Sequence, residues 1–270
     1  ALSVAALVGA PHAPYGQIGV AAWRGDRAGV ARLIATADEE MSAQLYRRTR
    51  EAGINFYDTA DVYSRGASET ILGRLIKGER DDLVITSKVG FSMGDGPNDS
   101  GLSRRHIVSS VENSLRRLGT DRLDFYFVHT FDDATPIEVS VQALDDLVRA
   151  GKVVYPAVSN WAAWQIATAL GVSARHALAR FELIQPMYNL VRRQAEVEIL
   201  PLARAENLGV ISYSPLGGGL LTGKYGADRR PESGRLVDHD LYTRRYSLRT
   251  DYQVADEFVA AADRFGIKPA

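Results

Sequence analysis

Four side chains able to hold or move a proton follow short apolar runs at separate places in the sequence. They are Asp58, Tyr63, Lys88 and His129. A buried lysine beside an aspartate stays protonated, because the carboxylate offsets the lysine's loss of hydration. The ammonium in turn lowers the pKa of a tyrosine hydroxyl from about 10, so that the tyrosine can give a proton to a developing alkoxide near neutral pH. A histidine that donates a hydrogen bond to the same oxygen polarises a carbonyl. The set therefore suits interconversion of carbonyl and alcohol.

That chemistry also needs a hydride, and because no protein side chain donates one, it requires a cofactor. The sequence has no serine nucleophile elbow, no H-E-x-x-H and no P-loop to indicate another chemistry. Taken one at a time, each residue has an ordinary interpretation: Asp58 as a turn residue, Lys88 as a solvated lysine and His129 as a core histidine. Their joint placement at successive strand ends favours a site. We interpret Asp61, in the same stretch INFYDTADVY, as a loop residue whose replacement by Asn leaves turnover nearly unchanged.

Six short runs, rich in β-branched and aromatic residues and apolar on both faces, are typical of parallel strands buried on both sides. They cover residues 54–58, 83–88, 123–129, 153–160, 183–189 and 209–216. The clearest helix between them spans 135–151, where Thr135 is the expected N-cap, Pro136 the first helical residue and Glu138 the end of a capping box. Further helices are predicted at 68–76, 103–119 and 195–209.

Strict alternation of strand and helix leaves two architectures, a doubly wound open sheet and a (β/α)8 barrel. No G-x-G-x-x-G follows a predicted strand, which favours the barrel. Active sites of such barrels form where the strands end, which is where the four residues lie.

The ends of the barrel are less regular. The first strand could be 18–23 or 31–36, and the pattern leaves both open. A long polar segment at about 222–250 is followed by one helix, and an eighth strand and helix are missing. We therefore expect an α/β fold, a (β/α)8 TIM barrel that lacks its eighth strand and helix in a truncated chain, as a single domain over residues 1–270.

The bulk composition excludes several classes of protein. The net charge of -1 and the pI near 6.6 give no electrostatic case for nucleic acid or an anionic membrane surface. The absence of cysteine excludes disulfides, thiolate zinc sites and cysteine nucleophiles, and it fits a reducing compartment. No apolar run is long enough to span a bilayer. We expect a cytoplasmic protein that acts on a small carbonyl compound, without a nucleic acid, membrane or metal partner.

Six longer motifs carry a family resemblance. They are GINFYDTADVYSRGASETILG, VITSKVGF, LDFYFVHTFD, GKVVYPAVSNW, IQPMYN and VISYSPLGGGLLTGKY. Across about positions 51 to 225 the sequence resembles the aldo-keto reductase family, in the branch that includes bacterial sugar and aldehyde reductases and potassium-channel β subunits. The resemblance implies a (β/α)8 barrel that binds NADP(H) without a Rossmann domain. It implies an NADPH-dependent reductase of aldehydes, ketones or sugars, or alternatively an NADP(H)-binding regulatory subunit with little turnover.

The resemblance also implies a role for each site residue. Tyr63 is the proton donor, tuned by Asp58 and Lys88, and His129 positions the carbonyl. The implied cofactor ligands are Ser159, Asn160 and Gln185 on the nicotinamide carboxamide, Tyr213 stacked on the nicotinamide ring, and Ser214, Pro215, Leu216, Gly217, Gly218 and Lys224 around the diphosphate. The family's contacts to the 2′-phosphate lie mainly after the seventh helix, so NADP rather than NAD is inferred from the family alone. Three aromatics near the rim are candidates either for the substrate wall or for core packing: Trp23, Phe91 and Trp161.

Overall fold

The computed structural model describes residues 3–5, 7–8, 30–32 and 39–269. Residue contacts divide the chain into two compact units, one of Ala1–Pro186 with Glu198–Ile211 and one of Met187–Val197 with Ser212–Ala270. We call them the first and the second unit. A single domain over residues 1–270 stays a prediction.

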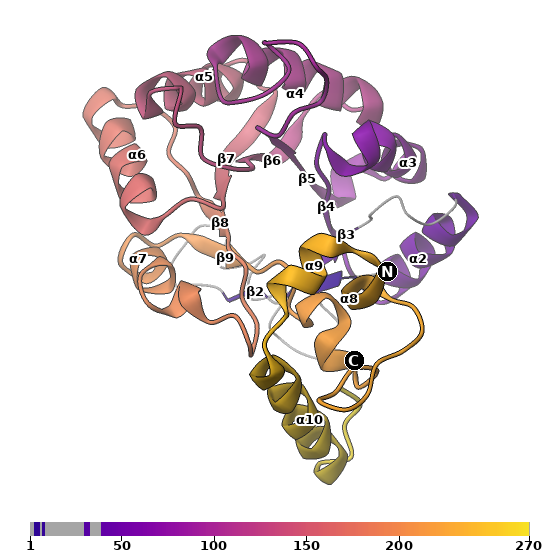
Figure 1. Cartoon of the computed structure of the whole chain (residues 1–270). Helices are drawn as coiled ribbons and strands as arrows, with labels where there is room; N and C mark the ends of the chain where they lie inside the picture. Colours follow the sequence, from indigo (N-terminus) through magenta and orange to yellow (C-terminus); the bar gives the residue numbers. More distant parts are fainter. Residues whose placement is uncertain (1–2, 6, 9–29, 33–38, 270) are drawn as a thin grey trace. The chain divides into compact units, whose positions relative to one another are not determined.

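The first unit is built on one sheet (Figure 1). Its parallel strands, in chain order and in sheet order, are β3 (Val30–Arg32), β4 (Phe56–Asp58), β5 (Val84–Val89), β6 (Leu123–Val128), β7 (Val153–Ser159), β8 (Leu183–Gln185) and β9 (Gly209–Ile211). Two short strands, β1 (Ser3–Ala5) and β2 (Leu7–Val8), pair antiparallel with β3 and β9. The strand that pairs with β4 is β3, and it overlaps the first barrel strand predicted at 31–36. The alternative at 18–23 lies outside the described residues.

Helices lie on the outer side of these strands (Figure 1). They are α2 (Glu39–Glu51), α3 (Ala67–Leu75), α4 (Arg104–Leu118), α5 (Ile137–Arg149), α6 (Ala163–His176) and α7 (Ile199–Ala205). The regular alternation confirms the predicted α/β fold class, a partial (β/α)8 barrel. Strands β4 to β9 are buried on both faces, as their sequences predict. Phe56, Phe125 and Phe127 pack with one another, whereas Tyr57 and Tyr126 belong to the cluster that includes the helices.

Local sequence determines both ends of α4. Ser103 caps α4, its Oγ accepting a backbone N–H of the first turn at 3.2 Å, and Gly119 ends the helix in the left-handed conformation (φ 64°). The capping box predicted for the next helix is wrong. That helix, α5, starts after Pro136, and the Thr135 hydroxyl donates to Asp132 Oδ2 at 2.7 Å. The reason is that a carboxylate is a strong acceptor and holds the hydroxyl away from the helix end.

The strands predicted at 183–189 and 209–216 and the helix predicted at 195–209 are shorter in the structure. The strands β8 and β9 end where the chain passes into the second unit. The predicted helix is divided into a 3-10 turn, η3 (Gln194–Glu196), and α7. Pro201 explains the break, because its ring would clash with the carbonyl four residues earlier in a continuous helix.

The second unit contains η4 (Gly217–Thr222), α8 (Arg235–Asp238), α9 (Asp240–Arg245) and α10 (Arg249–Arg264). Its core consists of Leu220, Leu221, Tyr225, Leu236, Tyr246, Tyr252 and Ala255. Arg192 joins the 187–197 segment to α10 through hydrogen bonds to both carboxylate oxygens of Asp251, at 3.0 Å each. None of the helices that the structure describes is long and apolar enough to cross a membrane.

Candidate active site

A buried ion pair occupies the carboxyl ends of β4 and β5. Lys88 Nζ donates to Asp58 Oδ1 at 2.5 Å and to the Thr59 carbonyl at 2.6 Å. Thr86 Oγ1 donates to the same aspartate oxygen at 2.7 Å. The Lys88 side chain is 0% exposed and the Asp58 side chain 2%. This excludes the interpretation of Lys88 as a solvated lysine, because a buried ammonium requires close partners of opposite charge.

Tyr63 begins the 3-10 turn η1 (Tyr63–Gly66), after the loop that follows β4. The Lys88 Nζ atom is 5.0 Å from the centre of the Tyr63 ring. The turn contains two non-glycine residues in the left-handed conformation, Ser64 (φ 49°) and Arg65 (φ 51°). Such backbone strain clusters at functional sites, where the surrounding structure holds a side chain in place against it. The structure therefore brings the tyrosine and the lysine together.

His129 follows β6 and completes the group. Its ring lies edge-on to Tyr63, with 5.7 Å between ring centres, and edge-on to Phe91, with 4.8 Å. Its backbone N–H donates to the Val89 carbonyl at 2.8 Å, which continues the sheet pairing and fixes the residue. Phe91 is 42% exposed. An aromatic ring that is open on one side and touches the histidine on the other suits the predicted substrate wall.

Trp161 has a different position. It is 3% exposed, and its ring packs edge-on against Phe131 at 4.9 Å and Phe181 at 5.6 Å between ring centres. Of the two interpretations left open for this residue, the geometry favours core packing. Trp164 of α6, which was not predicted as a site residue, is largely exposed. Its ring centre lies 6.3 Å from that of Phe131. Trp23 lies outside the described residues.

Three predicted cofactor ligands lie together at the carboxyl ends of β7 and β8. Ser159 and Gln185 are both buried and are partners in the parallel register, and Ser159 Oγ donates to the Gln185 carbonyl at 2.8 Å. Asn160 is exposed and left-handed (φ 58°), and its Nδ2 donates to the His129 carbonyl at 2.8 Å. One hydroxyl and two side-chain amides supply both donors and acceptors. This set fits a carboxamide, which needs both.

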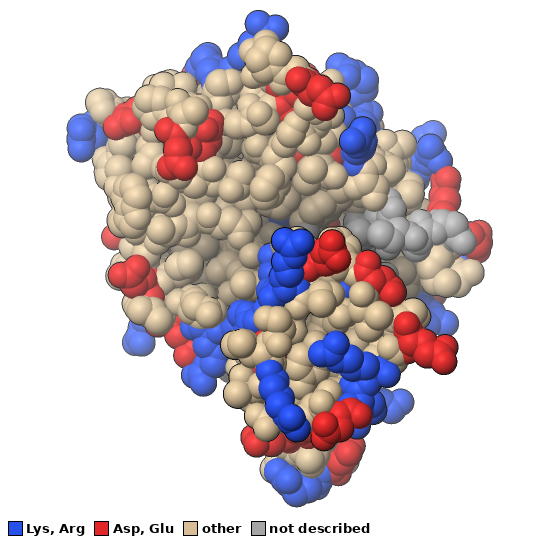
Figure 2. Space-filling model, viewed as in Figure 1, with Lys and Arg blue, Asp and Glu red and all other residues tan. Residues whose placement is uncertain are grey.

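The other predicted cofactor ligands belong to the second unit. They are Tyr213, Ser214, Pro215, Leu216, Gly217, Gly218 and Lys224. Gly217 (φ 59°) and Gly218 (φ 68°) are left-handed, and a Cβ on Gly218 would lie 2.7 Å from the Tyr242 ring, so this loop requires glycine. The Arg245 guanidinium lies 6.0 Å from the centre of the Tyr213 ring. Lys and Arg side chains are frequent over α8 to α10 in Figure 2. A glycine loop near cations fits a diphosphate.

Comparison with known proteins places the chain in a family. The profile of the Aldo/keto reductase family matches residues 18–270. The chain belongs to the aldo/keto reductase family.

Individual relatives of the chain carry different names. The chain is 40% identical over 204 residues to a probable voltage-gated potassium channel subunit beta of Oryza sativa subsp. japonica, covering 74% of this chain and 62% of that protein. It is 37% identical over 205 residues to the aldo-keto reductase YhdN of Bacillus subtilis, covering 75% and 60%. It is 31% identical over 253 residues to versiconal hemiacetal acetate reductase of Aspergillus parasiticus, covering 86% and 74%. The chain thus spans less than two thirds of the length of the first two relatives.

The first unit also contains a buried polar cluster that the sequence did not indicate. Asp61 lies in a loop, as predicted, but it is 1% exposed. Burial, and then the negative charge of Glu69, raise the pKa of Asp61 to about 7. Glu69 is buried on α3 and accepts hydrogen bonds from Ser87 Oγ at 2.5 Å and Arg117 Nε at 2.6 Å. The spacing of Glu69 three residues before the buried Leu72 is a signal that could have identified it, whereas a loop residue such as Asp61 offers no such signal.

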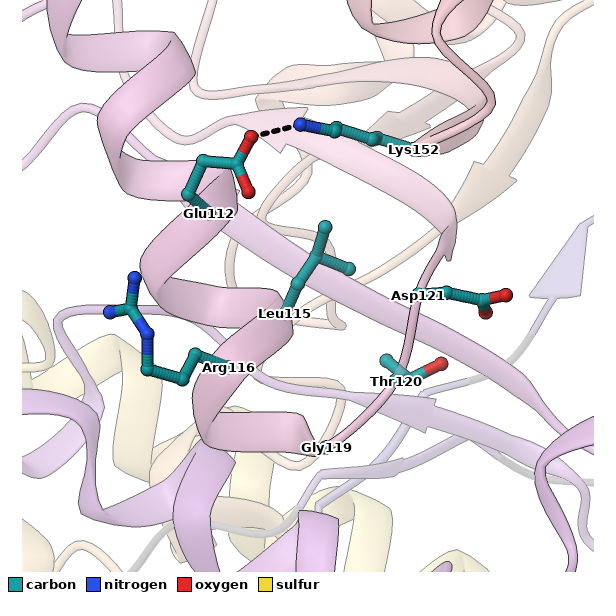
Figure 3. Close-up of a pocket in the computed structure, with 7 residues that line it drawn as sticks. All are labelled: Glu112, Leu115, Arg116, Gly119, Thr120, Asp121 and Lys152. Carbon is teal, nitrogen blue, oxygen red and sulfur yellow. Dashed lines mark hydrogen bonds and ion pairs between the residues drawn. The ribbon is translucent and has the colours of Figure 1, made fainter.

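A pocket of about 560 Å³ lies elsewhere in the first unit. It is lined by Glu112, Leu115, Arg116, Gly119, Thr120, Asp121 and Lys152. An ion pair joins Glu112 and Lys152 (Figure 3). Its lining comes from α4 and from the residues before β6 and β7, so it lies at the opposite strand ends from Tyr63 and His129. The group of proton-handling side chains, rather than this pocket, therefore defines the candidate active site.

Proposed function

We propose that the protein reduces aldehydes, ketones or sugars to alcohols with NADPH, and that Tyr63 is the proton donor. The observation that supports this best is the buried Lys88–Asp58 ion pair, whose ammonium lies 5.0 Å from the centre of the Tyr63 ring. A cation in that position favours the phenolate over the phenol and makes Tyr63 a stronger acid. Asp58 keeps the lysine charged in a position that is buried from solvent.

Reduction of a carbonyl adds a hydride at carbon and a proton at oxygen. His129, whose ring lies beside that of Tyr63, would donate a hydrogen bond to the carbonyl oxygen, and Tyr63 would give its hydroxyl proton to the same oxygen. When bound, NADPH supplies the hydride. Ser159, Asn160 and Gln185 would hold its carboxamide.

The similarity to potassium channel subunits supports a second candidate, an NADP(H)-binding regulatory subunit with little turnover. Identity to the rice protein, at 40%, is slightly higher than identity to YhdN, at 37%. The reductase proposal is favoured by the intact Asp58, Tyr63, Lys88 and His129 group and by the strained turn that begins at Tyr63. A protein that only binds a cofactor needs neither a buried charge beside a tyrosine nor strain to present it.

Turnover can be followed as the loss of NADPH absorbance in the near ultraviolet with a panel of aldehydes, ketones and sugars, and with NADH in parallel. Tyr63→Phe keeps the ring and removes the proton, so turnover should fall by about 10²–10⁴-fold, while NADPH binding, measured by its fluorescence, should be unchanged. Tyr46→Phe, which removes a buried hydroxyl from α2, is the matched control. Unchanged turnover in Tyr63→Phe contradicts the proton-donor role. Tight NADPH binding by the wild type without turnover of any substrate supports the regulatory candidate.

A further inference from the structure

Asp61 carries a buried carboxyl group that forms no ion pair with any residue the structure describes. The neighbouring carboxyls are paired, Asp58 with Lys88 at 2.5 Å and Glu69 with Arg117 at 2.6 Å. Asp61 Oδ1 accepts the backbone N–H of the next residue at 2.6 Å. Its Oδ2 atom is buried and has no hydrogen-bond partner in the part of the chain that the structure describes. When ionised, Asp61 therefore adds a negative charge that has no direct cationic partner among the described residues.

The loop that contains Asp61 is hydrogen-bonded to Lys88 of β5. The Asp61 N–H donates to the Lys88 carbonyl at 3.3 Å, and Lys88 Nζ donates back to the Thr59 carbonyl at 2.6 Å. The Tyr63 N–H donates to the Ala60 carbonyl at 3.1 Å. Asp61 therefore lies two residues before Tyr63 in the sequence, and its backbone is hydrogen-bonded to the backbone of Lys88.

Within the described part of the chain, titratable groups on several surrounding elements interact electrostatically with the Asp61 carboxyl. They are Glu69 from α3, Arg117 from α4, Lys88 from β5 and Tyr126 from β6. Arg117 and Lys88 are bonded to other carboxylates. Burial raises the pKa of Tyr126 well above its ordinary value, so its hydroxyl stays neutral. The pKa of about 7 for Asp61 means that its charge changes in the neutral range.

We propose that Asp61 is a positioning residue for the proton of Tyr63, because its carboxylate charge, held in the buried loop beside Lys88, sets how readily the tyrosine hydroxyl releases that proton. The inference deepens the proposed function and rests on it, since it concerns the same hydroxyl. A carboxylate opposes formation of a phenolate, because two negative charges repel each other strongly where the dielectric constant is low. Removal of the charge should make Tyr63 a stronger acid. At an effective dielectric constant of about 20, a charge on the order of 10 Å away changes an acid dissociation constant about tenfold.

The test is an ultraviolet titration of tyrosinate absorbance. The difference between the wild type and Tyr63→Phe isolates the titration of Tyr63 from that of the other tyrosines, and the same difference is then measured in the Asp61→Asn background. The midpoint should be lower by about one pH unit in Asp61→Asn. The alkaline limb of kcat/KM should move in the same direction by the same amount. Asp121→Asn, which removes a carboxylate that is 83% exposed, is the matched control and should leave the midpoint unchanged.

An unchanged or higher midpoint in Asp61→Asn overturns the inference, as does an equal shift in Asp121→Asn. If Asp61→Asn does not fold, Asp61→Ser supplies an uncharged side chain whose hydroxyl still accepts the Val62 N–H. The titration needs neither substrate nor cofactor. A shifted midpoint in a protein without carbonyl turnover therefore refutes the proposed function and supports the effect of Asp61, whereas turnover with an unshifted midpoint refutes the role of Asp61 alone.

Discussion

Asp58→Asn should destabilise the protein by about 3–5 kcal/mol, because it leaves the Lys88 ammonium in the interior without a negative partner. Lys88 is 0% exposed, and its acceptors are Asp58 Oδ1 at 2.5 Å and the Thr59 carbonyl at 2.6 Å. A carbonyl is a dipole and does not replace a full charge. Asparagine keeps the shape of the side chain and an acceptor oxygen, so the loss measures the missing charge rather than a cavity.

A double-mutant cycle separates this charge effect from general damage. Lys88→Met removes the ammonium and keeps an unbranched side chain. In the Asp58→Asn background it should restore most of the lost stability, since neutral replacement of both members of a buried pair is often close to neutral. The coupling between positions 58 and 88 should then be at least about 2 kcal/mol.

Urea unfolding of the four proteins gives the cycle. Tryptophan fluorescence suits the assay, because Trp161 is buried in the first unit, where the ion pair lies, and far-ultraviolet circular dichroism provides the second probe. Two results would refute the reasoning. One is a loss below about 1 kcal/mol in Asp58→Asn, which would mean that Lys88 does not need a charged partner. The other is a double variant no more stable than Asp58→Asn, which would mean that the loss is not caused by the unpaired ammonium.

Two further predictions concern stability. The pKa of Asp61 is raised from 3.8 to about 7 in the folded protein, so its stabilising contribution is complete below the unfolded pKa and is lost as pH rises through about 7. The unfolding free energy of Asp61→Asn, relative to that of the wild type, should therefore rise by about 2 kcal/mol between about pH 5.5 and 8.5, out of about 4 kcal/mol for the whole pKa shift. Urea unfolding that shows the same difference at both pH values would contradict this. A Cβ on Gly73 would lie 2.6 Å from the backbone oxygens of Arg117 and Leu118, so Gly73→Ala should cost about 1–3 kcal/mol. Its control, Gly171→Ala in α6, where a Cβ meets nothing within 4 Å, should gain about 0.5–1 kcal/mol, and melting temperatures in the opposite order would contradict both.

The grouping of Asp58, Lys88 and His129 could be predicted from sequence because these residues are placed by strand ends. Asp58 ends β4, Lys88 lies at the end of β5, and His129 follows β6. The carboxyl ends of parallel barrel strands meet at one rim whatever the detailed packing, so the residue type at each end is enough. The burial of Asp61 could not be predicted in the same way. It depends on the helices α3 and α4, which bring Glu69 and Arg117 to the loop. The sequence of the loop does not indicate how these helices pack against it.

Phe91 and Trp161 show that a position just after a barrel strand does not by itself predict what the side chain contacts. Both follow barrel strands and were predicted by the same rule, yet Phe91 is open to solvent beside His129 and Trp161 is buried against Phe131. The residue before Trp161 is Asn160, whose left-handed conformation (φ 58°) turns the chain at the end of β7. A strand end selects which residues reach the rim, whereas the backbone conformation of the next residue sets where the following side chain points. In the sequence, that conformation is visible only as the tolerance of asparagine for positive φ. Side chains at the strand ends can therefore be assigned from the alternation of strands and helices, whereas the substrate wall formed by the loops after them requires a structure.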